Sequence, residues 1–116
     1  MPSLLDRILR RDPDSLPHTV RVDRAMELLE AGAVLVDVRE PAEWRTGHAS
    51  RARHIPLGRL DRDARRLSTD TPVVVMCASG MRSRGAAAQL RAAGYRATSL
   101  SGGLAAWRAG GGSVTR

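Results

Sequence analysis

The sequence contains no phenylalanine and no lysine, and its aromatic residues are limited to Trp44, Tyr95 and Trp107. A buried core must therefore be built from leucine, valine, isoleucine and alanine. All 19 basic residues are arginine, and against 12 acidic residues they give a formal net charge of +7. The arginines are scattered and are not interleaved with aromatic residues, a pattern that argues against a nucleic-acid reader. A basic surface still attracts anions in general.

Cysteine is almost absent, since Cys77 is the only one in the chain. A single cysteine excludes an internal disulfide framework and a multi-cysteine zinc site, and it is typical of a reducing compartment. No apolar run approaches the roughly 18 residues of a membrane span, and the first residues are too highly charged for a signal peptide. We therefore expect a cytoplasmic protein with no metal site and no membrane or nucleic-acid partner.

Length and hydrophobic patterning predict one α/β domain. A chain of 116 residues is long enough for a single modest core. Continuous apolar runs at 33–38 and 73–76 are typical of strands that are buried on both faces. Segments with helical periodicity alternate with the strand candidates, and this alternation predicts a parallel sheet flanked by helices.

The expected elements follow one another with short connections. Strands are predicted at 18–22, 33–38, 52–55, 73–76 and 95–100, and helices at 23–30, 42–45, 57–67, 83–93 and 104–108. Local signals mark three helix limits, with Asp23 as an N-cap, Gly32 after a C-terminus and Pro41 at a first position. The predicted domain limits are 1–18 for a short amphipathic helical extension, 19–109 for the α/β domain and 110–116 for a flexible glycine-rich tail.

Two polar residues, Asp37 and Cys77, stand at the ends of the two strongest apolar runs. The carboxyl ends of parallel strands meet at one edge of a sheet, and ligands bind beyond that edge. The fold class alone therefore places both residues where chemistry is expected, independently of any motif.

The residues that follow Cys77 favour its thiolate, which is the reactive form of a thiol. The stretch from Ala78 to Ser83 leads into a predicted helix start, where free amides and the helix dipole attract negative charge. Gly80 allows a sharp turn that can curl successive amides around an anion, and Arg82 adds a full positive charge. The alternative is an inert buried cysteine at a strand end.

Four segments resemble those of the rhodanese-like sulfurtransferases, in the same order and at similar spacing. The stretch 77–83 (CASGMRS) resembles the active-site loop C-x-x-G-x-R-S, and 34–44 (VLVDVREPAEW) resembles the strand and DVRE segment. The pair Gly47-His48, followed by 55–57 (IPL), resembles the G-H…I-P segment, and 102–107 (GGLAAW) resembles the closing G-G-x-x-x-W. The third segment departs from the family pattern at Ala49 and Arg51. Arg51 adds a positive charge, which we expect near the mouth of the site.

The resemblance implies a five-stranded parallel sheet with helices on both faces and a sulfurtransferase activity. Cys77 would take a sulfane sulfur from a small anionic donor such as thiosulfate, form a persulfide and pass the sulfur to cyanide, a thiol or an acceptor protein. No metal or organic cofactor would be needed. Arg82 would orient the donor, and the other loop residues implied to bind it are Ala78, Ser79, Gly80, Met81 and Ser83. Asp37 would support the site by hydrogen bonds, and Arg39 would pair with Asp37 or with Glu43.

Three alternatives remain open at this point. Phosphatases that resemble this fold use a C-x5-R loop, whereas only four residues separate Cys77 from Arg82, which suits a sulfur better than a phosphoryl group. A non-enzymatic interaction module would not need the thiol. A sulfur-relay protein would keep the same chemistry and change only the acceptor. We expect His48 to be structural rather than a base for the thiol, and Trp44 and Trp107 to anchor the core.

Overall fold

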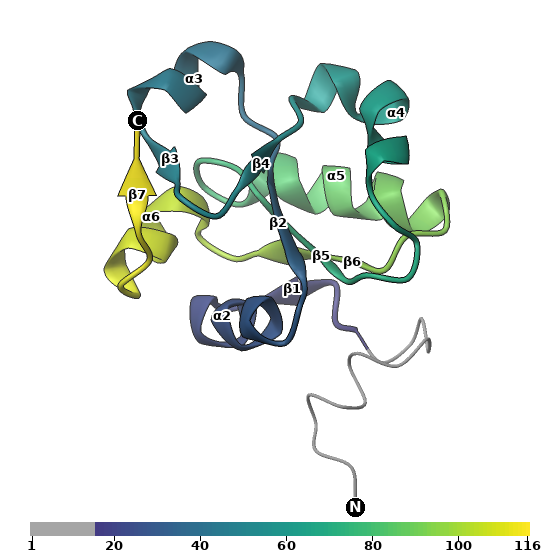
Figure 1. Ribbon diagram of the computed structural model, residues 1–116, viewed down its shortest axis with the longest axis horizontal. Helices are drawn as coiled ribbons and strands as arrows, with labels where there is room; N and C mark the ends of the chain where they lie inside the picture. Colours follow the sequence, from purple (N-terminus) through teal and green to yellow (C-terminus); the bar gives the residue numbers. More distant parts are fainter. Residues whose placement is uncertain (1–15) are drawn as a thin grey trace, which may run out of the picture.

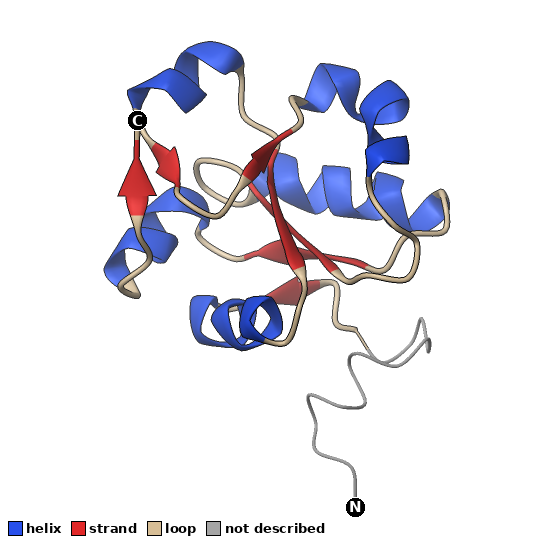
Figure 2. Ribbon diagram, viewed as in Figure 1, coloured by secondary structure: helices blue, strands red, loops and turns tan. Residues whose placement is uncertain are grey.

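A five-stranded sheet forms the centre of the computed structural model, which describes residues 16–116 (Figures 1 and 2). Its strands are β1 (Thr19–Val20), β2 (Val34–Asp37), β4 (Arg53–His54), β5 (Val73–Met76) and β6 (Ala97–Leu100). The strand order is β1-β6-β5-β2-β4, and each neighbouring pair is parallel. The predicted parallel α/β sheet is confirmed. The predicted N-terminal helix lies outside the described residues.

Helices cover both faces of the sheet and divide the core into two clusters. On one face lie α2 (Val22–Glu30) and α6 (Gly103–Ala109), and on the other lie α4 (Leu60–Asp63) and α5 (Met81–Ala92). Strand β5 contributes side chains to the core on both faces of the sheet, because alternate side chains of a strand point to opposite faces. Val74 and Met76 pack in the α2 layer, whereas Val73 and Val75 pack in the α5 layer. Such a strand reads as a continuous apolar run.

The stretch predicted as one amphipathic helix at 57–67 is broken into three short turns. They are η1 (Leu57–Arg59), α4 and η2 (Ala64–Arg66). The apolar positions explain the 3-10 turns, since Leu57 and Leu60 are three residues apart, as are Ala64 and Leu67. A 3-10 helix has three residues per turn, so this spacing keeps each pair on one face. Leu60, Ala64 and Leu67 are buried accordingly.

Two helix starts differ in detail from the prediction. Asp23 does not cap α2, because the helix already begins at Val22 and Asp23 falls in its first turn. A carboxylate at that position still favours the positive end of the helix dipole. Pro41 begins α3 (Pro41–Thr46), as predicted, and the capping box of this helix is formed by Glu40 and Glu43.

Residues 110–116, which the sequence predicts as a flexible glycine-rich tail, form a turn and a short strand in the structure. Val114–Thr115 form β7, which pairs antiparallel with β3 (His48–Ala49) in a separate two-stranded sheet. The glycines turn the chain back over Trp107, whose indole Nε1 donates a hydrogen bond to the Ser113 carbonyl at 2.9 Å. A side chain at Gly112 would overlap the indole, so this glycine allows the close packing.

Candidate active site

Cys77 lies directly after β5, at the carboxyl edge of the sheet, and its side chain is fully buried. The chain then turns at Gly80, which has a φ of 106° and is the N-cap of α5. This turn aims two amides at the sulfur: Gly80 N lies 3.0 Å and Ser83 N 3.4 Å from Cys77 Sγ. The predicted cradle of amides is therefore present at the start of the helix.

The Ser83 hydroxyl is the side-chain partner of the thiol, with its Oγ 3.6 Å from Cys77 Sγ. The same oxygen lies 2.7 Å from Ser99 Oγ on β6 and 3.2 Å from the Gly80 carbonyl. A hydroxyl has one proton to donate. When Ser99 donates to Ser83, the one Ser83 proton can go either to the Gly80 carbonyl, to which it donates in the structure, or to a sulfur anion. The buried Ser99 was missed by sequence reasoning, because nothing local connects the last strand with the loop.

Two opposing effects act on the pKa of the Cys77 thiol. Burial raises this pKa, because it disfavours the thiolate. Hydrogen bonds from the Ser83 hydroxyl and from the amides of Ser83, Gly80 and Ser79 lower it, and together they outweigh burial. The pKa of Cys77 is therefore below that of an ordinary cysteine, and the loop favours an anion on the sulfur.

Arg82 does not stand free as a donor-binding cation. Its guanidinium forms two hydrogen bonds with the Glu43 carboxylate of α3, at 2.7 and 2.9 Å. These bonds lower the pKa of Glu43 to about 2, against the opposing effect of burial, and they raise the pKa of Arg82 further. The sequence motif predicted Arg82 near the thiol but gave no sign that Glu43 holds it.

Asp37 and Arg39 form a second, buried ion pair. Arg39 Nη2 lies 2.8 Å and Nε 2.9 Å from Asp37 Oδ2, so the predicted pairing with Asp37 is the one observed. Arg39 also donates to the Gly47 carbonyl at 2.7 Å, and its Nη1 reaches the main-chain carbonyl of Glu43 at 3.4 Å. The pair therefore fixes both ends of α3 relative to the sheet and positions Glu43 beside the loop.

Helix α6 supports the loop from the other side. Leu104 N donates to the Cys77 carbonyl at 2.9 Å. Gly103 has a φ of 57°, and a side chain there would overlap the carbonyls of Cys77 and Ala78. The G-G pair of the closing segment thus lets the start of α6 approach the backbone of the loop.

The remaining predicted residues lie around this centre in different ways. Ala78, Ser79 and Met81 are exposed, and the Met81 side chain is 80% accessible. His48 Nδ1 lies 2.9 Å from the Trp44 carbonyl, and its ring stacks on the Trp44 indole with centroids 3.5 Å apart. This contact agrees with a structural role.

Trp44 stacks with a second imidazole and is half-buried rather than part of the core. The His54 ring lies with its centroid 4.5 Å from that of the indole, and His54 Nε2 is 2.8 Å from the Arg39 carbonyl.

Arg51 does not lie at the mouth of the site. Its Nη2 donates to the Leu29 carbonyl at 3.1 Å, in the last turn of α2. Since α2 runs from the end of β1 back to the start of β2, its last turn lies at the amino edge of the sheet, opposite Cys77. Arg51 therefore caps a helix end, where a cation is favourable.

Within residues 16–116, no cluster of three histidine, cysteine or carboxylate side chains is arranged to hold a metal ion. In the same part of the chain, no helix has the length and hydropathy to cross a membrane.

The fold is a parallel α/β sheet, and the site is a thiol in an amide-lined loop at the carboxyl edge of that sheet. Both features are those of the rhodanese-like class of proteins. A family model, the Rhodanese-like domain, matches residues 21–110. The chain belongs to the rhodanese-like family.

Several solved structures are similar to this chain. A rhodanese-related protein from Thermoplasma volcanium is 28% identical with a TM-score of 0.77, over 85% of this chain and 98% of that chain. A rhodanese-like domain from Anabaena sp. is 30% identical with a TM-score of 0.76, over 86% of this chain and 80% of that chain. Reduced Bacillus anthracis CoADR-RHD is 31% identical with a TM-score of 0.72, over 81% of this chain and 17% of that chain.

Proposed function

We propose that the protein is a sulfurtransferase that carries a sulfane sulfur on Cys77. The observation that supports this is the pair of amides, from Gly80 and Ser83, directed at Cys77 Sγ from 3.0 and 3.4 Å. An amide cradle at a helix N-terminus stabilises a sulfur anion. A persulfide is such an anion, with one sulfur added to the cysteine.

The reaction proceeds as two displacements. The Cys77 thiolate attacks the sulfane sulfur of a donor such as thiosulfate, the donor S–S bond breaks, and its electron pair leaves on sulfite. The product is a Cys77 persulfide anion. Cyanide or a thiolate then attacks the outer sulfur, and the Cys77 thiolate leaves with the electron pair of the S–S bond. Neither displacement needs a cofactor, and a reducing compartment such as the cytoplasm keeps the Cys77 thiol that the first displacement requires.

Arg82 binds the anionic donor in this proposal, but only in competition with Glu43. The guanidinium already has a carboxylate on two of its N–H groups. An incoming dianion must share or displace that carboxylate. The loop amides and Arg82 together orient the donor, and Glu43 sets how readily Arg82 can take part.

A non-enzymatic interaction module is the second proposal, and it is favoured by the complete burial of the Cys77 side chain. A phosphatase is disfavoured by the four-residue separation of Cys77 and Arg82, one residue shorter than a C-x5-R loop.

Sulfur loading distinguishes the two proposals. The protein is incubated with thiosulfate, desalted and measured by intact mass, and the loaded form is then mixed with cyanide to follow thiocyanate. We expect one added sulfur atom on the wild type and none on Cys77→Ser. A wild type that gains no sulfur from thiosulfate or from polysulfide refutes the sulfurtransferase and leaves the interaction module.

A further inference from the structure

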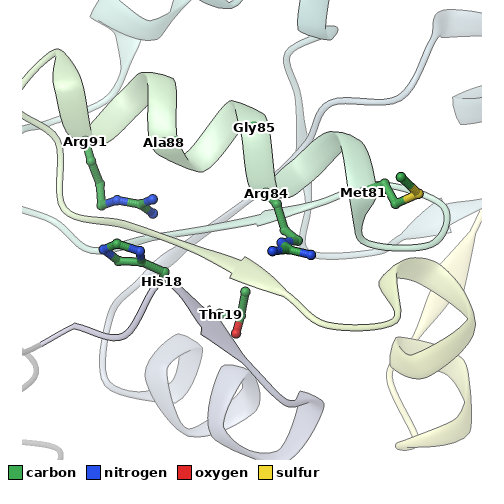
Figure 3. A pocket seen from close by; sticks show the side chains of 7 residues that line it. All are labelled: His18, Thr19, Met81, Arg84, Gly85, Ala88 and Arg91. Carbon is green, nitrogen blue, oxygen red and sulfur yellow. The ribbon is translucent and has the colours of Figure 1, made fainter.

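A groove of about 570 Å³ runs along one flank of α5, beside β1 (Figure 3). Two segments that are far apart in the sequence line it. The lining residues are His18 and Thr19 at the start of the domain, and Met81, Arg84, Gly85, Ala88 and Arg91 on α5. The strand β1 is at the edge of the sheet, so the groove lies where the α5 layer meets that edge.

The groove is cationic. Arg84 and Arg91 extend from α5 toward the strand side, where His18 and Thr19 lie (Figure 3). No carboxylate is among the lining residues of the described chain. The two arginines are seven residues apart, which is about 10 Å along a helix. This separation is too large for one small anion to bridge, and it favours an occupant with negative charges spread along its length.

The groove continues to the active-site loop. A second hollow of about 370 Å³ shares Thr19, Met81 and Arg84 with the first. Its other lining residues are Ser79, Gly80, Ser101 and Gly102. A segment that lies in the groove would therefore reach the loop whose amides contact Cys77 Sγ, and it would pass the exposed Met81.

The edge of the sheet offers main-chain groups to an extended segment. The carbonyls of His18 and Val20 accept hydrogen bonds from Ser99 N and Ser101 N, at 3.0 and 2.8 Å. These two residues therefore face β6. The main-chain groups of the residue between them, Thr19, point away from the sheet, because main-chain direction alternates along a strand. Extended peptides bind to such edges by adding main-chain hydrogen bonds.

We propose that this groove binds an extended acidic segment of a protein that accepts the sulfur from Cys77. The proposal rests on the sulfurtransferase function proposed above. In an extended segment, side chains on one face recur every second residue, so carboxylates four residues apart share a face and are separated by about 13 Å. The long side chains of Arg84 and Arg91 can reach both of them from positions about 10 Å apart on the helix. A single-stranded nucleic acid suits the groove less well, because no tryptophan, tyrosine or phenylalanine lines it for base stacking.

Binding is tested on the unloaded protein, without any sulfur chemistry. A fluorescently labelled peptide with a Glu-x-x-x-Glu segment and its Gln-x-x-x-Gln counterpart are titrated at low salt and followed by anisotropy. We expect the acidic peptide to bind about tenfold more tightly, the combined effect of two exposed charge pairs, and added salt to reduce the difference.

Charge-matched variants locate the effect. Arg84→Gln with Arg91→Gln should remove the preference for the acidic peptide, whereas Arg65→Gln with Arg66→Gln, exposed on η2, should keep it. Arg91 also donates to the Ala97 carbonyl at 3.2 Å. Arg84→Gln alone is therefore the safer variant for the fold, and it should reduce the preference about threefold.

Sulfur transfer is then measured from the persulfide-loaded protein to the same two peptides, each with one added cysteine. The acidic peptide should react faster, with the same dependence on Arg84. The proposal is overturned if the two peptides bind equally well, or if the Arg65/Arg66 variant loses the preference for the acidic peptide as fully as the Arg84/Arg91 variant does. Tighter binding of an oligonucleotide through Arg84 also overturns it. Failure of sulfur loading refutes the sulfurtransferase and the acceptor role, while the binding measurement separately decides whether the groove holds an acidic segment.

Discussion

Replacing Glu43 by glutamine should release Arg82 and increase the affinity for anionic donors. In the wild type, the Glu43 carboxylate occupies two N–H groups of the Arg82 guanidinium at 2.7 and 2.9 Å. Glutamine has a similar shape and can still accept the amide of Glu40, which bonds to Glu43 Oε1 at 3.0 Å. The substitution therefore removes the competing charge with little change to the start of α3.

The magnitude follows from the ion pair. The pKa of Glu43 is lowered from 4.5 to about 2, but both side chains are about one third exposed, at 34% and 37%. Solvent screening reduces the free energy of such a pair to about 1 kcal/mol. If the donor no longer displaces Glu43, the KM for thiosulfate should fall by about fivefold. The kcat should change little, because the contribution is to donor binding.

Steady-state thiocyanate formation measures this effect, with Glu40→Gln as the control that removes the same charge from the neighbouring position. The pKa of about 2 for Glu43 means that the pair is lost only as the pH falls from about 4.5 toward 2. The difference in KM should therefore be constant above about pH 5. A Glu43→Gln variant whose KM for thiosulfate is unchanged or higher would show that the carboxylate positions Arg82 rather than competing for it.

Two further predictions concern the buried hydroxyls. Ser83→Ala should raise the pKa of Cys77, because the hydroxyl that stabilises the thiolate is removed; ultraviolet titration of the thiolate should show the midpoint at higher pH, and an unchanged midpoint would assign the effect to the amides alone. The Thr98 hydroxyl is buried, and no hydrogen-bond partner is found for it within the described chain. Thr98→Val should therefore increase the free energy of unfolding by about 1 kcal/mol in urea denaturation, and a loss of stability would reveal a partner for that hydroxyl.

Local signals in the sequence were sufficient for much of the fold and for the centre of the site. The apolar run of β5, the turn at Gly80 and the helix after it determine where Cys77 lies, and all three are encoded within a few neighbouring residues. The partner of Arg82 could not be found in this way. Glu43 is 39 residues away in the sequence, and Arg39, four residues before Glu43, was an equally plausible partner for it.

The conformation of the C-terminal residues could also not be predicted from local sequence signals. The run Gly110-Gly111-Gly112 has the composition of a flexible tail. Its conformation depends on a distant strand, β3, and on the indole of Trp107, which lies close to Gly112. Sequence patterns describe elements that are stabilised by their own neighbours along the chain, and they miss segments that are held by contacts with remote ones.

The stacking of Trp44 on His48 and His54 gives the protein an intrinsic optical probe. Indole emission depends on the rings in contact with it, and only two tryptophans are present. Trp44 adjoins Glu43, so displacement of that carboxylate by a donor would change the charge close to the indole and its stacked rings. Trp107 hydrogen bonds to the Ser113 carbonyl in the C-terminal turn and provides a steady background. Stopped-flow fluorescence of the unlabelled protein can therefore follow donor binding separately from the chemistry at sulfur.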